Sequence, residues 1–176
     1  MKTREWLRLY DDVDLFYEGL ARVRKGSKHF HVCSNGTVAY KQKYDAVGSF
    51  SEGLAWARKS GKYFHILANG APAYKERYDL VGSFSEGLAW VVKNGKYFHI
   101  HPDGTSAYEQ RYDFADSFFE GLALVKKGEE WFHIRFNGAP AYKERYDGAN
   151  SFLEGLAWVR KAGKWFQIHP DGTVAG

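Results

Sequence analysis

A histidine recurs along this chain at a constant interval of 34 residues. Neutral imidazole is the commonest metal ligand in proteins, so the recurrence raises the question of a metal site. The column consists of His31, His65, His99 and His133, with Gln167 in the fifth place. Gln167 can replace the hydrogen bonds of a histidine but is a poor ligand, and ligands supplied one per repeat around a ring do not converge on one ion. We therefore expect these histidines to bond neighbouring turns or a recurring Asp, with no metal ion and no cofactor.

A glutamate followed by glycine recurs at the same interval. The column consists of Glu18, Glu52, Glu86, Glu120 and Glu154. Enzymes that use two carboxylates place them in different environments, so that their pKa values separate. Equivalent copies in one context are the opposite arrangement, and the sequence contains no Ser-His-Asp signature, phosphate-binding Gly loop or metal motif. We expect each Glu to lie in a turn or to pair with basic residues, and we predict that the chain has no catalytic residue and is not an enzyme.

Tryptophan supplies a third column, which is more promising for binding. It consists of Trp56, Trp90 and Trp158, with Arg22 and Leu124 in the other two repeats. Indole faces stack on sugars and cations, and a repeated site gives multivalency. Packing in the core explains such a column as well, because strand positions in a core are often aromatic.

A unique binding site is expected where the repeats differ, because recurrence marks what every repeat needs for folding. One variable position holds Asp14, Asp116 and Asn150, and another holds His101 and His169. Because His99 and His101 are two residues apart, they would lie on one face of a strand. The candidate ligand-binding residues are therefore Trp56, Trp90, Trp158, His99, His101, His169, Asp14, Asp116 and Asn150.

Basic pairs such as Arg24-Lys25 and Arg58-Lys59 recur at one turn of each repeat except the third. In a ring they would form a basic rim, able to meet nucleic acid or another anionic polymer. The chain has 25 Lys and Arg against 21 Asp and Glu, a net charge of +4 with histidines neutral. This modest excess makes a solvated face with ion pairs the competing interpretation.

All these residues belong to one internal repeat, whose period is constant along the chain. The dipeptide Tyr-Asp, the columns of Phe and the sequence Glu-Gly-Leu-Ala keep a step of 34 residues without insertion. The predicted units are 10–43, 44–77, 78–111, 112–145 and 146–176, the last completed by residues 1–9. We expect residues 1–176 to form a single repeat domain.

Turn signals divide each unit into short segments that are rich in strand-forming residues. Asn-Gly or Asp-Gly between apolar segments is a strong hairpin signal, because both turn positions need positive φ. Residues 97–100 carry large groups on both faces, which calls for packing on both sides. The charged residues 73–77 suit an outer edge strand. We expect an all-β fold with four short strands per unit, each unit being one blade of a small propeller.

The two ends of the chain are complementary in sequence. Residues 174–176 align with residues 38–40, so the last unit lacks its outer segment, and residues 6–10 align with residues 40–44. We therefore predict a closed five-bladed β-propeller in which the N-terminal strand completes the last blade. The alternative is an open β-hairpin solenoid, for which capping repeats would be expected.

The repeat resembles the WG (also called KWG) repeat family of bacterial tandem arrays. The residues that carry the resemblance are Tyr78-Asp79, the run from Phe84 to Val91, and Gly95-Lys96. The family usually has Trp-Gly after that Lys, whereas this chain has Tyr97-Phe98. The resemblance covers all five units and implies a bacterial β-repeat array, with no catalytic residue to transfer.

Composition excludes several other classes. The chain is 44% hydrophobic and 18% aromatic, which is too apolar for a disordered protein. One cysteine, Cys33, excludes an internal disulfide framework, and no apolar run is long enough for a membrane helix. The first residues lack the apolar stretch of a signal peptide, so we expect a cytoplasmic monomer without membrane contact.

These observations predict a non-catalytic binding or scaffold protein that recognises a protein or carbohydrate ligand through aromatic surfaces. Binding of nucleic acid or another anionic polymer through the basic rim is the alternative. A metal-dependent enzyme using His99, His101 or His169 is the third and weakest hypothesis.

Overall fold

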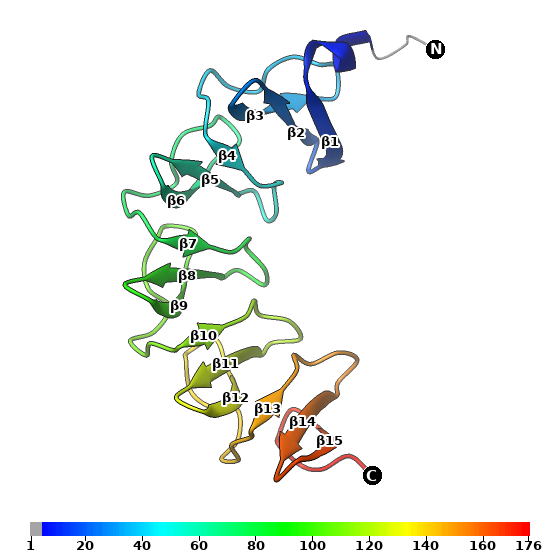
Figure 1. Ribbon diagram of the computed structural model, residues 1–176, viewed down its shortest axis with the longest axis vertical. Coiled ribbons are helices and arrows are strands. Elements are labelled where there is room, and N and C mark those ends of the chain that lie inside the picture. Colours follow the sequence, from blue (N-terminus) through cyan, green and yellow to red (C-terminus); the bar gives the residue numbers. More distant parts are fainter. Residues whose placement is uncertain (1–4) are drawn as a thin grey trace. The chain divides into compact units, whose positions relative to one another are not determined.

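The computed structural model describes residues 5–176, whose regular elements are short β-strands (Figure 1). A 3-10 helix, η1 (Glu5–Leu9), precedes the strands. The strands form five three-stranded antiparallel sheets, one in each predicted repeat, so the prediction of an all-β repeat fold is confirmed. Among the described residues, no helix has the length and apolar character to cross a membrane.

Each sheet follows the order of its strands in the sequence. The bounds are β1 (Asp12–Tyr17), β2 (Leu20–Lys25) and β3 (Lys28–Cys33); β4 (Ala46–Val47), β5 (Ala55–Lys59) and β6 (Lys62–Ile66); β7 (Leu80–Val81), β8 (Ala89–Lys93) and β9 (Lys96–Ile100); β10 (Phe114–Ala115), β11 (Ala123–Lys127) and β12 (Glu130–Ile134); and β13 (Gly148–Ala149), β14 (Ala157–Lys161) and β15 (Lys164–Ile168). The second and third strands of a sheet are the long pair, and the first is usually two residues.

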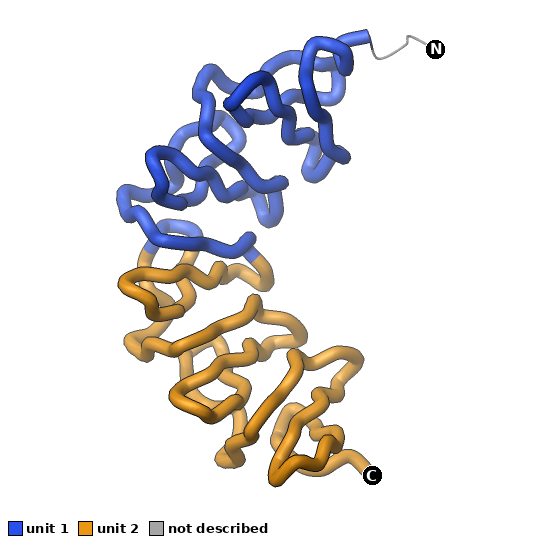
Figure 2. The backbone as a smooth tube through the Cα atoms, in the orientation of Figure 1, with its two compact units in different colours: residues 1–84, 102–104 blue, residues 85–101, 105–176 orange. Residues whose placement is uncertain are grey.

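The chain divides into two compact units, which are described separately below (Figure 2). Unit 1 comprises residues 1–84 and 102–104, and unit 2 comprises residues 85–101 and 105–176. The first two repeats lie in unit 1 and the last two in unit 2. Equivalent residues in the two units can therefore be compared.

The third strand of the first four sheets is buried on both faces, as its large side chains on both faces predict, whereas β15 is buried only at Ile168. In β6, Phe64, His65 and Ile66 are all buried, with Ile66 fully enclosed. The partner strand β5 supplies small residues, since Ala55 and Ala57 are buried opposite Ile66 and Phe64. Small side chains on one strand thus leave room for large ones on the next, which is how the core is filled.

Two-residue turns lie at the Glu-Gly dipeptides. Glu52 has φ of 53° and Gly53 has φ of 78°, and Ser51 and Leu54 close the turn by exchanging two main-chain hydrogen bonds. Positive φ at both central residues is the pattern of a type I′ turn, whose twist matches that of antiparallel strands. In this turn the non-glycine residue in the left-handed region is a Glu in every repeat, which is uncommon for a long side chain.

Asn94 and Gly95 both have positive φ, but the Asn-Gly and Asp-Gly dipeptides that end at Gly36, Gly70, Gly104, Gly138 and Gly172 form a different turn from the one that we predicted. Gly36 has φ of 85°, but Asn35 is not in the left-handed region. The Gly36 N–H donates to the Cys33 carbonyl, and the Asn35 side chain accepts hydrogen bonds from both Thr37 N–H and Thr37 Oγ1. The prediction of positive φ at both positions was wrong because Asn35 supports the turn through its side chain.

The predicted fourth strand is not formed either. Residues 73–77 contain no strand, and the ladder continues only through isolated bridges such as Tyr63 with Tyr78. The Nη1 of Arg77 donates to the carbonyls of Tyr74, Lys75 and Glu76 at 3.2, 2.9 and 2.8 Å. Three successive carbonyls that converge on one guanidinium cannot belong to an extended strand, since they alternate in direction there.

The N-terminal segment corrects the prediction of a sealing strand. Glu5–Leu9 is a 3-10 helix, and the last sheet contains β13, β14 and β15 with no strand from residues 5–9; residues 1–4 lie outside the described residues. Trp6 packs on Gly36 of the first repeat and lies 6.2 Å from the Phe16 ring. Tyr40 packs on Gly70 in the same way, so the alignment of Trp6 with Tyr40 is right, but Trp6 completes the first repeat.

Candidate functional site

The histidine column is a buried structural hydrogen-bond system. His65 is fully buried; its Nε2 donates to the Gly82 carbonyl at 2.8 Å, and its Nδ1 accepts from the Tyr74 hydroxyl at 2.5 Å. The tautomer follows from the carbonyl, which can only accept. Burial lowers the pKa of His65 to about 4, and the equivalent His31, His99 and His133 have the same partners and the same lowered pKa.

This arrangement occupies both nitrogens of each buried histidine. His99 bonds the Tyr108 hydroxyl and the Asp116 carbonyl, at 2.5 and 2.9 Å. In residues 5–176, no three His, Cys, Asp or Glu side chains are arranged to hold a metal ion. The interpretation that these histidines bond neighbouring turns is therefore the one that the contacts support.

The recurring glutamates bind main-chain groups of the following repeat. In unit 1, Glu18 Oε2 accepts the Gly53 N–H at 2.9 Å. In unit 2, Glu86 accepts the Gly121 N–H, and Glu120 accepts the N–H groups of both Glu154 and Gly155, at 2.7 and 2.9 Å. Each of these three carboxylates thus joins its own turn to the next one.

The tryptophan column pairs with the variable position that holds Asp14, Gly48, Asp116 and Asn150. Gly48 donates its N–H to the Trp56 carbonyl, and a Cβ on Gly48 would collide with the Trp56 indole. Asp14 forms an ion pair with Arg22 at the equivalent place. Asn150 donates its N–H to the Trp158 carbonyl, and there the indole is 47% exposed. The absence of a Cβ at Gly48 therefore leaves room for the Trp56 indole.

The remaining predicted residues are Trp90, Asp116, His101 and His169. Trp90 is half-buried, with its ring 5.7 Å from that of Tyr97. Asp116 accepts a hydrogen bond from the Ser151 hydroxyl at 2.9 Å. His101 is exposed and lines a small hollow with Phe136, and His169 is exposed, with its N–H bonded to the Thr173 carbonyl. Their predicted ligand-binding roles stay predictions.

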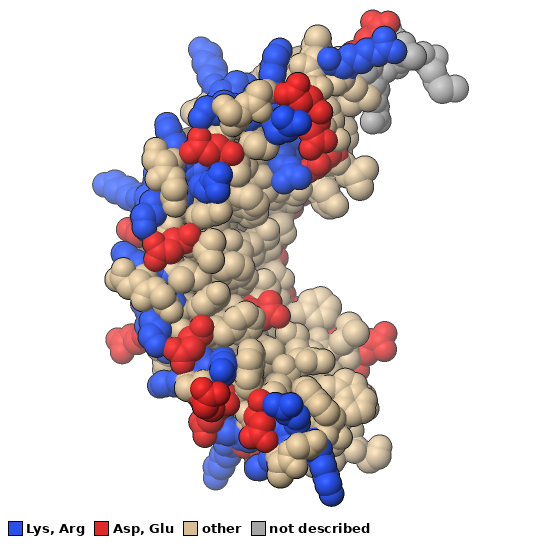
Figure 3. Space-filling view, in the orientation of Figure 1, with Lys and Arg blue, Asp and Glu red and all other residues tan. Residues whose placement is uncertain are grey.

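The basic residues are interleaved with acidic ones on the surface of both units (Figure 3). The recurring Asp accounts for several of the pairs: Lys28 with Asp45 at 2.7 Å, Lys62 with Asp79 at 2.6 Å, and Lys96 with Asp113 at 2.5 Å. Asp45 also accepts the Ser60 N–H, and these bonds lower the pKa of its carboxyl. A continuous basic rim is therefore interrupted by its own counter-charges.

The last repeat carries a pocket in which two of the predicted residues meet. It has a volume of about 330 Å³ and is lined by Asn150, Ser151, Leu153, Glu154, Trp158 and Gln167, with Leu156 beside them. Leu153 is 65% exposed and Trp158 47%, so the pocket has an apolar wall next to polar groups. In the described part of the chain, the Glu154 carboxylate and the Gln167 amide have no hydrogen-bond partner.

Sequence reasoning identified Trp158 and Asn150 but did not place Glu154 and Gln167 in a site. The Glu154 column predicts a role in folding, and Gln167 in place of a histidine argues only against a metal ion. The signal was the break in the histidine column, since Gln167 is where the recurring His is lost.

The fold and the repeated contacts define an all-β tandem-repeat protein. The chain belongs to the WG-containing repeat family, whose model matches residues 9–28, 34–63, 76–97, 100–131 and 144–165. No curated protein matches the sequence significantly.

Solved structures with a similar fold include propeller-like proteins. Hsv2 from Kluyveromyces marxianus has a TM-score of 0.60 at 10% identity, over 95% of this chain and 62% of that one. Hsv2p from Kluyveromyces lactis has a TM-score of 0.53 at 9% identity, over 94% and 62%. A eukaryotic initiation factor has a TM-score of 0.54 at 9% identity, over 95% and 54%. The chain thus spans less than two thirds of their length, and identities this low show a likeness of fold alone.

Proposed function

We propose that this chain is a non-catalytic binding protein, and that the exposed face of its last repeat recognises a β-turn of a protein ligand. A tandem-repeat protein with propeller-like neighbours is compatible with such a role. The observation that carries the proposal is the chemistry of the same face in the preceding repeat.

In the fourth repeat this face binds the main chain of a turn. Glu120 accepts the N–H groups of Glu154 and Gly155, and His133 Nε2 donates to the Asn150 carbonyl at 2.9 Å. The face therefore offers one acceptor and one donor at the spacing of a peptide turn. Main-chain groups are the same in any protein, so this chemistry does not depend on the sequence of the turn.

The last repeat presents the equivalent groups without a partner in the described residues. Glu154 corresponds to Glu120, and Gln167 corresponds to His133, with an amide in place of the imidazole donor. Both line the pocket, together with the indole of Trp158. Tryptophan is enriched among the residues that contribute most to the affinity of protein interfaces.

A carbohydrate ligand is the competing possibility, because indole faces also stack on sugars. The carboxylate and amide are arranged here as in a face that binds peptide groups, which favours a protein ligand. A ligand with a turn would bury the Trp158 indole and satisfy Glu154 and Gln167 at the same time.

The test uses the full chain and a cyclic peptide that reproduces residues 148–157, the turn bound by the fourth repeat. We expect the peptide to change the tryptophan fluorescence and to bind with a Kd that rises about tenfold or more in Glu154→Asn and in Trp158→Ala. Asn tolerates the positive φ of position 154 but is too short to reach the peptide. The matched control is Glu129→Gln, which removes an exposed carboxylate elsewhere in the same unit.

The outcomes separate the alternatives. Binding of maltohexaose or cellohexaose, lost in Trp158→Ala while the peptide does not bind, would replace the protein ligand by a carbohydrate. Peptide binding that is equally weak in Glu129→Gln and Glu154→Asn would contradict the assigned role of Glu154. The absence of binding to any of these probes would overturn the proposal.

A further inference from the structure

A second pocket lies in unit 1, beside the turn between β5 and β6 of the second repeat. It has a volume of about 420 Å³, within the usual range for small-ligand sites. Three cations line it, Lys59, Lys62 and Arg77, together with an apolar wall of Tyr44, Phe64 and Pro72. No acidic residue of the described chain is among its lining residues.

The guanidinium of Arg77 is fixed before any ligand arrives. Its Nη1 donates to three carbonyls, and its Cζ lies 4.0 Å from the centroid of the Phe64 ring. The Nη2 group has no hydrogen-bond partner among the described residues. A cation held in place by its other contacts loses little conformational entropy when it binds an anion.

The two lysines complete a set of positive charges around the opening. Lys62 is held by Asp79, with Nζ 2.6 Å from Oδ1. Lys59, at the end of β5, has no ion-pair partner in the described residues. Gln42, which also lines the pocket, is neutral, whereas the equivalent residue of the fourth repeat is Glu144.

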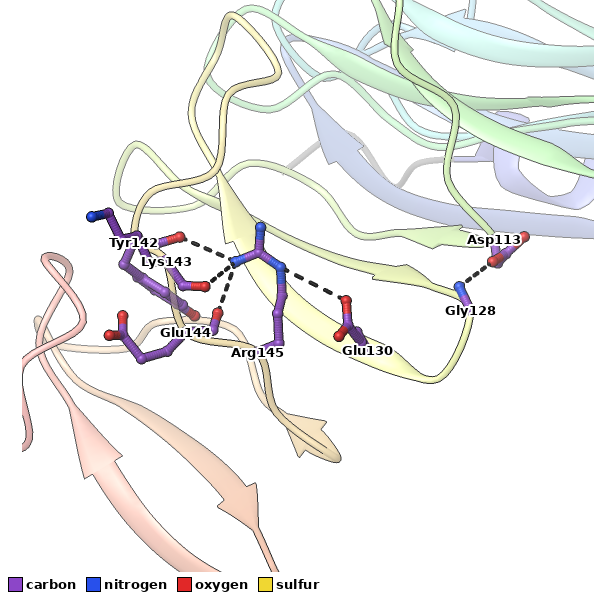
Figure 4. Close-up of polar contacts among 7 residues, drawn as sticks. All are labelled: Asp113, Gly128, Glu130, Tyr142, Lys143, Glu144 and Arg145. Carbon is purple, nitrogen blue, oxygen red and sulfur yellow. Dashed lines mark hydrogen bonds and ion pairs between the residues drawn. The ribbon is translucent and has the colours of Figure 1, made fainter.

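The fourth repeat provides an internal control in unit 2. There Glu130 stands at the position of Lys62, and its Oε2 lies 4.0 Å from Nε of Arg145, the equivalent of Arg77 (Figure 4). Arg145 makes the same three carbonyl contacts and lies over Phe132 as Arg77 lies over Phe64. The scaffold is therefore unchanged, and a carboxylate of the chain itself lies at the limit of ion-pair distance from the guanidinium.

The distribution of charge along the sequence agrees with this difference. Residues 1–77 carry 14 Lys and Arg against 8 Asp and Glu, a net charge of +6, whereas residues 78–176 carry 11 against 13, a net charge of −2. The modest total of +4 thus hides a basic first part. A positive field around the second-repeat pocket would attract anions and raise their association rate.

We propose that the second-repeat pocket binds a small ligand in which an acid group, phosphate or carboxylate, is attached to an aromatic ring. The acid group would pair with Lys59, Lys62 and the free Nη2 of Arg77. The ring would lie against Tyr44 and Pro72. This site is independent of the last repeat, so Trp158→Ala should leave its affinity unchanged.

The test is calorimetric titration of the full chain with phenyl phosphate and with benzoate, which distinguish the two acid groups. Inorganic phosphate and phenol supply the charge and the ring separately, and we expect each to bind about fivefold or more weakly than the better aromatic acid. Lys62→Glu, which copies the fourth repeat, should raise the Kd about tenfold or more.

Lys59→Gln tests the site without removing an ion pair of the folded chain, so it should leave folding unchanged. It should raise the Kd about threefold, while Lys127→Gln, the same change at the equivalent place in the fourth repeat, should leave it within about twofold. Equal losses in Lys59→Gln and Lys127→Gln, or binding no tighter than that of inorganic phosphate, would show non-specific charge attraction and overturn the site. The absence of heat from both aromatic acids at millimolar concentration would overturn it as well.

Discussion

The β5–β6 hairpin of the second repeat and the β11–β12 hairpin of the fourth repeat have the same strand pairing, but they carry opposite charges at one equivalent position. In both, an arginine is fixed by three carbonyls and a phenylalanine ring, and a buried histidine lies behind it. The position facing the arginine is Lys62 in the second repeat and Glu130 in the fourth. One hairpin thus leaves its guanidinium available, and the other neutralises it.

This difference teaches where specificity can reside in a repeated fold. Groups that join one repeat to the next are the same in every copy, because each junction needs them. The hairpin ends lie outside these junctions, so their charges can change at little cost in stability. The following predictions test that division, from the largest effect to the smallest.

The largest effect should come from acid, because it acts on all four buried histidines at once. Their pKa is about 4 in the folded chain and 6.5 when unfolded, so below pH 6.5 the unfolded state binds more protons. The free energy of unfolding should be constant above pH 7 and fall between pH 6.5 and 4, by up to about 1.4 kcal/mol per histidine for each pH unit.

Urea unfolding at several pH values measures this slope. The slope of the unfolding free energy against pH reports how many more protons the unfolded state binds. If the two repeats share one scaffold, His65→Gln and His133→Gln should each reduce this number by the same amount, up to one proton. If His65→Gln changes this slope and His133→Gln does not, the second and fourth repeats are not equivalent.

The next effect concerns the turn glycines on which an aromatic side chain packs. A Cβ on Gly70 would clash with Tyr40, and a Cβ on Gly138 would lie 2.6 Å from Cγ of Tyr108. Gly70→Ala and Gly138→Ala should each cost about 2–4 kcal/mol, from the clash and the positive φ together. Gly53→Ala, with nothing within 4 Å, should cost only about 1 kcal/mol. Denaturant unfolding measures the loss of stability in the three variants. An equal loss in all three would show that the aromatic contact is not its cause.

A smaller effect is expected at the two arginines. Lysine cannot reproduce the three carbonyl contacts or the stacking on phenylalanine, so Arg77→Lys and Arg145→Lys should each lower the stability by about 1–2 kcal/mol. The two values should agree, because Glu130 adds only a long ion pair. Thermal unfolding of both variants checks this, and a much larger loss for Arg145→Lys would give Glu130 a structural role.

The smallest change in stability should follow from exchanging the charges themselves. Lys62→Glu and Glu130→Lys each alter an exposed ion pair and should shift the stability by about 0.5 kcal/mol or less. Glu130→Lys should at the same time give the fourth repeat a measurable affinity for phenyl phosphate. A variant that is unchanged in stability and still does not bind would mean that Lys62 is not sufficient to make the site.

The sequence predicted the features that depend on periodicity. The repeat units, the all-β class and the structural role of the histidines follow from residue types at a fixed spacing, and the WG-repeat resemblance was confirmed. The expected N-terminal strand failed because Trp6 reaches a glycine in its own repeat. A contact over a short stretch of chain closes a small loop and costs less entropy than one with the last repeat.

The parts that could not be predicted depend on contacts within the folded repeat. The Asn-Gly pattern predicts positive φ at Asn35, but the Asn35 side chain bonds Thr37 instead. Positive φ occurs at Glu52, in the Glu-Gly turn of the next repeat. The second-repeat pocket joins Gln42, Lys59 and Arg77, whose separations in the sequence carry no motif. Its charge is visible only when the residues that face one another are known.

The junction contacts also have a genetic consequence. Glu18 binds the turn of the second repeat as Glu120 binds that of the fifth, and Tyr40 packs on Gly70 as Tyr142 packs on Gly172. A recombination event that adds or removes one whole period would therefore join two ends that already fit. Arrays of this kind can change length in a single step, and each new copy is then free to acquire its own hairpin charges.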